Sequence, residues 1–320
     1  IVVGYLVAVL VRPVIAVTAA AWQVIGLRVV DRLGKGLRTP PRDALIGDVT
    51  PPALHGRAFG LQRGFDHAGA VLGPLAAWGL LAGFGADVRT VILASIVPGV
   101  LVLVLAGLAV RDPERRNEAH SGAAGDGSVT VRDRAFSRTS APLSLAAVAF
   151  FYLIRMPETL IILHAQQLGI AVALVPLLWA GVHVIKASAS FAGGALSDRW
   201  GPSVTMWIGW ASYAALAAGM ALASGALAAW ALFLAIGIVA GLTESPERAL
   251  VAAHAGARTG SGFGVYHAAT GVAALLGALA LGTVFQRVSG RAAFAASAAL
   301  GLVLVLLWPF VARARRVPPR

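Results

Sequence analysis

Five basic side chains recur along residues 28–42 with the spacing of one helix face. They are Arg28, Arg32, Lys35, Arg38 and Arg42. Side chains three or four residues apart share a face of a helix, and charge at membrane depth usually faces a bundle interior or a water-filled pathway. The spacing therefore predicts a basic lining that attracts an anionic or zwitterionic solute. The alternative is an internal ion-pair network with the nearby acids Asp31, Asp43 and Asp66.

Two consecutive prolines, Pro40 and Pro41, interrupt this basic stripe. Proline lacks a backbone N–H and clashes with the preceding turn, so we expect the helix to end or kink there. Arg28 and Lys35 should then lie deepest in the membrane, and Arg42 and Asp43 should lie at its rim.

A second charged cluster lies in the other half of the chain. Arg155 and Glu158 are three residues apart, so they can touch along one helix face. Pro157 between them predicts a broken helix that lines a cavity. Lys186, which shares a helix face with His183, is expected to pair with Glu158 or to extend its amine toward the membrane surface.

Two shorter features complete the set of expected pathway or coupling residues. Arg12 precedes Pro13 inside an apolar run, and helices bend at proline, so Arg12 either lines a cavity or pairs with a carboxylate elsewhere. Asp66 and His67 follow one turn after Arg63. A carboxyl group desolvated at this depth could carry a proton, whereas the competing interpretation is an ion pair with Arg63.

The elements that would position these residues are membrane helices. Hydrophobic residues make up 58% of the 320 residues, charged residues only 12%, and the mean hydropathy is +0.80, whereas soluble domains carry about 25% charge. Apolar runs of about 20 residues, the length of a membrane-spanning helix, predict an all-α, polytopic membrane helical bundle. The runs are 1–20, 22–48, 59–83, 88–110, 142–165, 171–196, 203–223, 226–246, 261–285 and 291–312.

The basic residues outside the runs lie in alternate connections. The net charge of +12 therefore follows the positive-inside rule and does not indicate nucleic-acid binding. We expect the polar loop 111–141 and the C-terminal tail 313–320 to be cytoplasmic and the protein to be a multi-pass protein of the inner membrane.

Enzyme chemistry finds little support in the sequence. The chain has no cysteine, which excludes disulfides and thiolate metal sites. Gly34-Lys35-Gly36 lacks the spacing of a phosphate loop. We see no metal-ligand spacing, catalytic triad or dinucleotide fingerprint, so we expect no enzyme activity, no metal and no cofactor.

The chain contains an internal repeat. Pro41-Arg-Asp-Ala-Leu-Ile returns as Pro246-Glu-Arg-Ala-Leu-Val, and Gly56-Arg-Ala-Phe-Gly-Leu returns as Gly260-Ser-Gly-Phe-Gly-Val, at offsets of 205 and 204. Paired halves are typical of secondary transporters. The expected organisation is an incomplete N-terminal half over 1–110, a linker over 111–141 and a six-helix half over 142–320. Aligning the halves predicts that the chain holds ten of twelve helices, and the alternative is a genuine ten-helix protein.

Several motifs resemble those of the major facilitator superfamily of secondary transporters over essentially the whole chain. Arg28 with Gly34-Lys-Gly36 resembles the family's fourth-helix motif, and Gly69-Ala-Val-Leu-Gly73-Pro74 resembles the fifth-helix glycine-proline motif of exporters. Gly194-Ala-Leu-Ser-Asp198-Arg199-Trp-Gly201 resembles the second copy of a family loop motif, although Pro202-Ser203 replaces its final arginines. The resemblance implies gating or structural roles for Gly69, Gly73, Pro74, Asp198, Arg199 and Gly201.

The sequence also predicts contacts of individual side chains and glycines. Asp198, in a loop, should act as a latch on the N-terminus of a helix, where negative charge is stabilised. Glu244 and Arg248 are four residues apart and should pair. Gly60 with Gly64, and Gly69 with Gly73, have the small-x-x-x-small spacing of closely packed helices.

Together these features predict a monomeric secondary active transporter that moves a small solute by alternating access, with proton-coupled export as the expected mode. A solute importer, and a non-transporting receptor or scaffold with the same fold, are the alternatives. The residues expected in the pathway or in coupling are Arg12, Arg28, Asp31, Arg32, Lys35, Arg38, Asp66, His67, Arg155, Glu158, His183 and Lys186.

Overall fold

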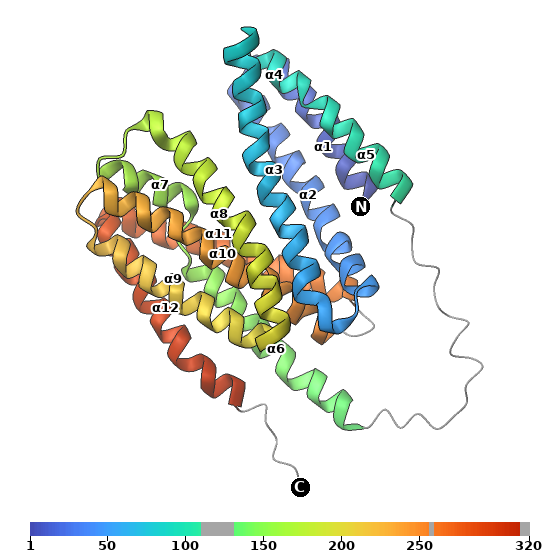
Figure 1. Cartoon of the computed structure of the whole chain (residues 1–320), viewed down its shortest axis with the longest axis vertical. Coiled ribbons are helices and arrows are strands. Elements are labelled where there is room, and N and C mark those ends of the chain that lie inside the picture. The colour runs from blue at the N-terminus through green and yellow to red at the C-terminus, as the bar shows by residue number, and fades with distance from the viewer. Residues whose placement is uncertain (110–130, 256–258, 314–320) are drawn as a thin grey trace. The chain divides into compact units, whose positions relative to one another are not determined.

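The structure, a computed structural model, describes residues 1–109, 131–255 and 259–313. All regular elements in these ranges are helices, and no strand is found in them (Figure 1). The helices are α1 Val2–Ala16, α2 Ala21–Val49, η1 Pro52–Leu54, α3 His55–Phe84, α4 Val88–Ala94, α5 Ile96–Ala109, α6 Val131–Ile154, α7 Glu158–Gln167, η2 Val172–Leu174, α8 Val175–Trp200, α9 Pro202–Leu222, α10 Ala226–Ala255, α11 Thr259–Arg287 and α12 Gly290–Arg313.

Eight helical segments are long and apolar enough to cross a membrane, which confirms the multi-pass helical fold. They cover η1 with α3, α4 with α5, the second half of α6 with α7, η2 with α8, and α9 to α12. The first expected run yields only the 15-residue helix α1, and the second yields α2, which is long but carries the charged stripe.

Two boundaries differ from those expected. Helix α2 continues through Pro40 and Pro41 to Val49 and does not end there. Helix α6 begins at Val131, so the last part of the expected linker is helical. The rest of that linker, residues 111–130, and the tail residues 314–320 lie outside the described residues.

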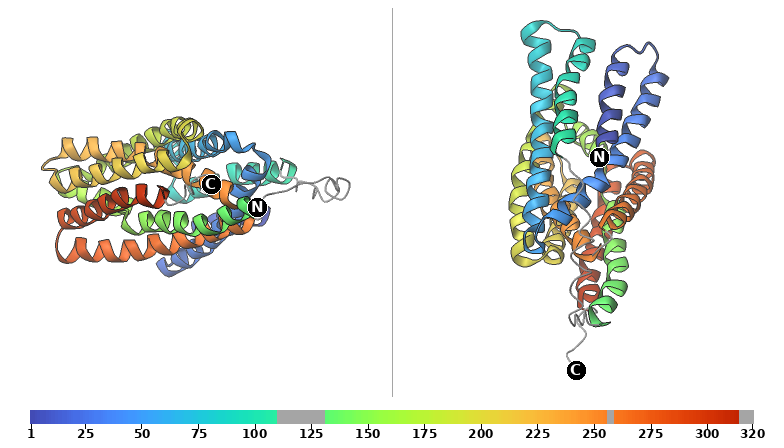
Figure 2. Two further views of the ribbon diagram at one scale, coloured as in Figure 1. Left: turned by 90° about the horizontal axis from the view of Figure 1, so that it is seen from below. Right: turned by 90° about the vertical axis from the view of Figure 1, so that its right-hand side faces the viewer.

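Contacts divide the chain into two units. Unit 1 comprises Ile1–Arg42 and Leu75–Ser137, and within it α1 packs against α4 and α5. Unit 2 comprises Asp43–Pro74 and Arg138–Arg320. In unit 2, α10 packs against α8, α9 and α11, α12 packs against α9, and these helices run side by side (Figure 2). Unit 2 therefore also contains the segment 43–74, which precedes the expected linker.

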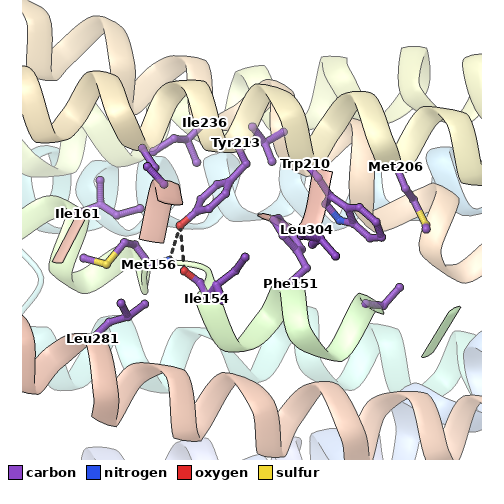
Figure 3. Close-up of a cluster of buried hydrophobic side chains, with 14 of the residues drawn as sticks. Phe151, Ile154, Met156, Ile161, Met206, Trp210, Tyr213, Ile236, Leu281 and Leu304 are labelled. Atoms are coloured by element: carbon purple, nitrogen blue, oxygen red, sulfur yellow. Dashed lines mark hydrogen bonds between the residues drawn. The ribbon is translucent and has the colours of Figure 1, made fainter. Parts of the chain in front are cut away.

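The core of unit 2 holds the break between α6 and α7 in place (Figure 3). Broken helices at membrane depth need new partners for the freed backbone groups. The N–H of Met156 donates to the hydroxyl of Tyr213 over 2.7 Å, and the hydroxyl of Ser297 donates to the carbonyl of Ile154 over 2.6 Å. The two hydroxyls are 2.6 Å apart, so α9 and α12 together support the break.

Candidate functional site

The break after α6 presents two oppositely charged side chains to the interior of unit 2. Helix α6 ends at Ile154 and α7 begins at Glu158, directly after Pro157, as the sequence predicts. The Nη2 atom of Arg155 lies 3.8 Å from Oε1 of Glu158. The same carboxylate oxygen binds Nζ of Lys186 from α8. Lys186 is 3% exposed, and a buried cation needs such a partner because desolvating it is costly.

A second ion pair joins α3 to α10. Arg63 binds Oε2 of Glu244 through both Nε, at 2.6 Å, and Nη2. Its Nη1 donates to Oδ2 of Asp66 over 3.1 Å, which agrees with the competing interpretation of Asp66 as an ion-pair partner. Arg63 thus holds two carboxylates with one planar guanidinium, an arrangement that suits arginine better than lysine.

One histidine lies next to Glu244, and a second histidine contacts the first. Nε2 of His67 on α3 is 3.6 Å from Oε2 of Glu244, and the rings of His67 and His183 are 5.5 Å apart in an edge-on arrangement. Nδ1 of His183 is 2.9 Å from the carbonyl oxygen of Trp179. A carbonyl only accepts hydrogen bonds, so Nδ1 of His183 carries a hydrogen.

A third cluster connects the two repeats. Asp43 on α2 is fully buried, and its Oδ2 accepts from Nε of Arg248 at 3.1 Å and lies 2.9 Å from Nε2 of His267. Helix α2 does not end at its prolines, and it carries Asp43 into the interior of unit 2.

The expected pairing of Glu244 with Arg248 is wrong. Arg248 donates through Nη1 to the backbone carbonyl of Glu244 over 2.6 Å, while the carboxylate of Glu244 binds Arg63. The carboxylate partner of Arg248 is instead Asp43. Glu244 faces α3 and Arg248 faces α2, so each side chain binds a partner on another helix and they do not bind each other through their charged groups.

These groups surround an open cavity of about 360 Å³ in unit 2. The lining residues are Arg63, Tyr152, Arg155, Met156, Pro157, Glu158, Glu244, Arg248, Ala274 and Ala278. At 3.8 Å the ion pair of Arg155 with Glu158 exceeds hydrogen-bond distance, so this guanidinium retains donors for a ligand. Guanidinium groups recognise carboxylates and phosphates through paired hydrogen bonds. The small side chains of Ala274 and Ala278 line the same cavity.

Asp198 reaches the N-terminus of a neighbouring helix. Its Oδ1 accepts from the backbone N–H of Gly56 at 2.6 Å, and its Oδ2 accepts from that of Arg57 at 3.0 Å, in the first turn of α3. Asp198 and Arg199 lie in the last turn of α8 and not in a loop as expected. Gly201, with a φ of +86°, separates α8 from α9 in a conformation that favours glycine.

Comparison with known proteins decides the family. The Major Facilitator Superfamily model matches residues 1–270. The chain belongs to this superfamily of transporters. An uncharacterized MFS-type transporter of Methanocaldococcus jannaschii is 27% identical over 284 residues, which cover 88% of this chain and 70% of that protein. An uncharacterized protein of Mycobacterium tuberculosis is 28% identical over 329 residues, with 99% and 77% coverage.

Solved structures show the same superfamily fold. The human organic anion transporter MFSD10 has a TM-score of 0.75 at 12% identity, with 96% of this chain and 76% of that chain covered. The proton:xylose symporter XylE has a TM-score of 0.75 at 13% identity, with 97% and 79% coverage. The E. coli fucose:proton symporter FucP has a TM-score of 0.70 at 15% identity, with 97% and 82% coverage. At these identities the likeness concerns the fold alone.

The glycines of α3 differ in how closely other helices approach them. A Cβ added at Gly60 would lie 2.6 Å from the carbonyl oxygen of Ser190, and one added at Gly64 would lie 2.5 Å from the ring of Phe191. These two glycines therefore allow α3 to approach α8. At Gly69 and Gly73 no described atom lies within 4 Å of an added Cβ, so the expected close packing is absent there among the described residues, and Pro74 is exposed.

The remaining expected pathway residues belong to unit 1. Arg38 donates to the carbonyl of Gly4 over 3.4 Å, and its guanidinium lies 4.6 Å from the centre of the Tyr5 ring. Asp31 is partly exposed and acts electrostatically on Arg38. Arg12, Arg28, Arg32 and Lys35 are exposed within the part of the chain that the structure describes.

Several residues of these clusters are not among the pathway or coupling residues expected from the sequence. They are Arg63, Tyr152, Glu247, Arg248, Tyr266 and His267. The repeat contained a usable signal, since Arg42-Asp43 aligns with Glu247-Arg248 and the charges are reversed at both positions. Reversed charges at equivalent positions predict a pair across the repeat, and Asp43 with Arg248 forms one. No group of three or more potential metal ligands occurs among residues 1–109, 131–255 and 259–313.

Proposed function

We propose that this superfamily member is a secondary transporter that moves a small anionic or zwitterionic solute by alternating access. The observation that carries the proposal is the cavity of unit 2, which Arg155 lines at a helix break, together with Ala274 and Ala278. Discontinuous helices that end at a charged cavity form the substrate sites of many secondary transporters. Arg155 would bind the carboxylate or another anionic group of the solute, and Glu158 would bind a cationic group if the solute has one.

The same cluster supports proton coupling. His67 on α3 lies beside Glu244 on α10, and His183 on α8 contacts His67. A proton taken up by His67 would place a second cation beside the carboxylate of Glu244, in competition with Arg63, and so bias the helices that carry these groups. Asp66 belongs to this network through Arg63, and Lys186 belongs to the neighbouring pair with Glu158.

The direction that we propose is export from the cytoplasm across the inner membrane, by a monomer whose central loop and C-terminus are cytoplasmic. The support is the resemblance of residues 69–74 to the exporter motif and the distribution of basic residues. Asp198 would latch α8 to α3 on the cytoplasmic side. The basic stripe with Arg28 and Lys35 would line the path of the solute. Import is the competing direction, and two structures with this fold are symporters.

Inside-out vesicles with an imposed proton gradient test this proposal. Organic anions, zwitterions, drugs and siderophores are added in turn, and proton movement is recorded alongside solute flux. We expect one class of solute to trigger a pH change that Arg155→Gln and Glu158→Gln abolish. Arg287→Gln, at an exposed position in the last turn of α11, is the matched control and should behave as the wild type.

The outcomes separate the alternatives. Solute accumulation in the opposite direction would establish import. Solute flux without any pH change would remove proton coupling but keep transport. No flux of any solute by folded protein would contradict the proposal and favour a receptor or scaffold.

A further inference from the structure

Glu247 differs from the other buried carboxylates of unit 2. Asp43 is held by Arg248, and Glu244 is held by Arg63. The polar groups that contact Glu247 are instead two neutral tyrosine hydroxyls. Glu247 is 1% exposed, so it is buried about as deeply as Asp43 and Glu244, which have cationic partners.

The hydrogen bonds of Glu247 use only one of its oxygens. Tyr152 from α6 donates to Oε2 over 3.1 Å, and Tyr266 from α11 donates to the same oxygen over 2.9 Å. The other oxygen, Oε1, is buried and has no hydrogen-bond partner among the residues that the structure describes. A buried carboxylate that lacks partners is costly, whereas its protonated form is neutral.

The surroundings allow both protonation states. The charged and titratable groups that act on Glu247 are Arg248 and Glu244 from its own helix, Arg155 and Tyr152 from the α6 side, and Tyr266 from α11. Next to Arg248 lie Asp43 and His267. Tyrosine hydroxyls can donate to a carboxylate and can equally accept from a carboxylic acid, so the site keeps its hydrogen bonds when a proton binds.

Glu247 also lies between two cavities. Tyr152 lines the open charged cavity of about 360 Å³, together with Arg155. Tyr266 lines a second, mainly apolar cavity of about 170 Å³, together with Ser144 and His254. Since both tyrosines bind Oε2, a proton can reach this carboxylate from either cavity through one hydroxyl.

We infer that Glu247, bound by Tyr152 and Tyr266, is a proton-binding site of unit 2 through which the proposed transport is coupled to protons. The inference rests on the proposed function for its role in coupling, but proton binding itself requires no solute. The carboxylate takes one proton from water in one cavity to form the neutral acid, and later returns it to water. The imidazoles of His67 and His183 are then auxiliary to this site.

Infrared difference spectroscopy of the full chain in liposomes tests proton binding directly. We expect a C=O stretching band of a protonated carboxylic acid that appears as the pH falls and is absent in Glu247→Gln. Glu158→Gln is the matched control, because Glu158 is a glutamate with a lysine partner, and this variant should retain the band. Tyr152→Phe and Tyr266→Phe should shift the band, since each removes a hydrogen bond from the carboxyl group.

Several results would overturn the inference. A titrating band that survives in Glu247→Gln would assign the proton to another group. Absence of any titrating band in the folded wild type would exclude a protonated carboxyl group. If Glu247→Gln does not fold, an unshifted band in both tyrosine variants would equally contradict the site.

Transport measurements then separate this inference from the proposed function. Glu247→Gln should retain solute counterflow, which requires no net proton movement, and should lose accumulation driven by a pH gradient. Accumulation that persists in this variant would overturn the coupling role. A wild type that transports none of the solutes yet shows the Glu247 band would contradict the proposed function while leaving the proton site in place.

Discussion

At the scale of residues, two basic side chains share one carboxylate unequally. Glu158 binds the buried Lys186 directly and binds Arg155 at 3.8 Å. The side chain of Lys186 is 3% exposed and that of Glu158 is 29% exposed. Loss of Glu158 would leave the buried Lys186 without a counter-ion. Loss of Lys186 would leave Glu158 with Arg155 as a partner and with some exposure to solvent.

This asymmetry predicts different costs for two single substitutions. Glu158→Ala leaves a buried cation without its carboxylate and should destabilise the protein by about 3–5 kcal/mol. Lys186→Met should cost clearly less, and adding it to Glu158→Ala should recover much of the loss. The measurement is thermal unfolding of the purified variants in detergent. Equal costs, or a larger cost for Lys186→Met, would contradict the described pairing.

The sequence predicts part of this cluster but not all of it. Arg155, Glu158 and Lys186 are predictable, because charge within apolar runs and a proline between two charges are visible locally. The pairing of Arg63 with Glu244 joins residues 181 positions apart. Such a pair depends on how helices are arranged in space, which local periodicity does not contain.

At the scale of elements, proline has two different consequences in this chain. Helix α6 ends before Pro157, and Tyr213 and Ser297 supply partners for the freed backbone groups. Helix α2 instead continues through Pro40 and Pro41. The residue type predicts a perturbation in both cases, but neighbouring helices decide whether the helix breaks.

Helix α3 allows a matched test of close packing. A Cβ at Gly60 would lie 2.6 Å from the carbonyl oxygen of Ser190 and 3.1 Å from Cα of Gly194. Gly60→Ala should therefore push α3 away from α8 and destabilise the protein by about 1–3 kcal/mol. Thermal unfolding in detergent measures this change.

Gly69→Ala is the control in the same helix, because nothing described lies within 4 Å of its added Cβ. Alanine is the better helix former by about 1 kcal/mol, so this variant should be neutral or slightly stabilised. A similar loss in both variants would show that glycine flexibility, and not the crossing of α3 with α8, determines the effect.

At the scale of the whole molecule, the two repeats meet at positions that are equivalent in sequence but opposite in charge. Asp43 and Arg248 occupy equivalent positions at the repeat offset of 205 and bind each other. The repeat and the membrane-helix fold are predictable from the sequence, since length and hydropathy determine them. The grouping of residues 43–74 with unit 2 is not predictable from these features, because it arises from buried contacts between helices.

The equivalence of the two positions predicts that their charges can be exchanged. Asp43→Arg alone and Arg248→Asp alone each bury like charges or an unpaired charge, and each should destabilise the protein by about 3–5 kcal/mol. The double exchange should restore part of the stability, but not all of it, because His267 lies beside position 43. The yield and thermal unfolding of the folded protein measure this. A double variant no better than the single ones would contradict a direct pair.

The most direct test of alternating access is the accessibility of the unit 2 cavity from each side of the membrane. The chain has no cysteine, so Ala278→Cys places a single reactive thiol in the lining of the cavity. Labelling with a membrane-impermeant thiol reagent is measured from one side at a time, at several pH values and with the solutes that move. We predict that the thiol reacts from both sides and that pH or solute shifts the balance between them. Reaction from one side only, unchanged by any condition, would contradict alternating access and favour a receptor or scaffold.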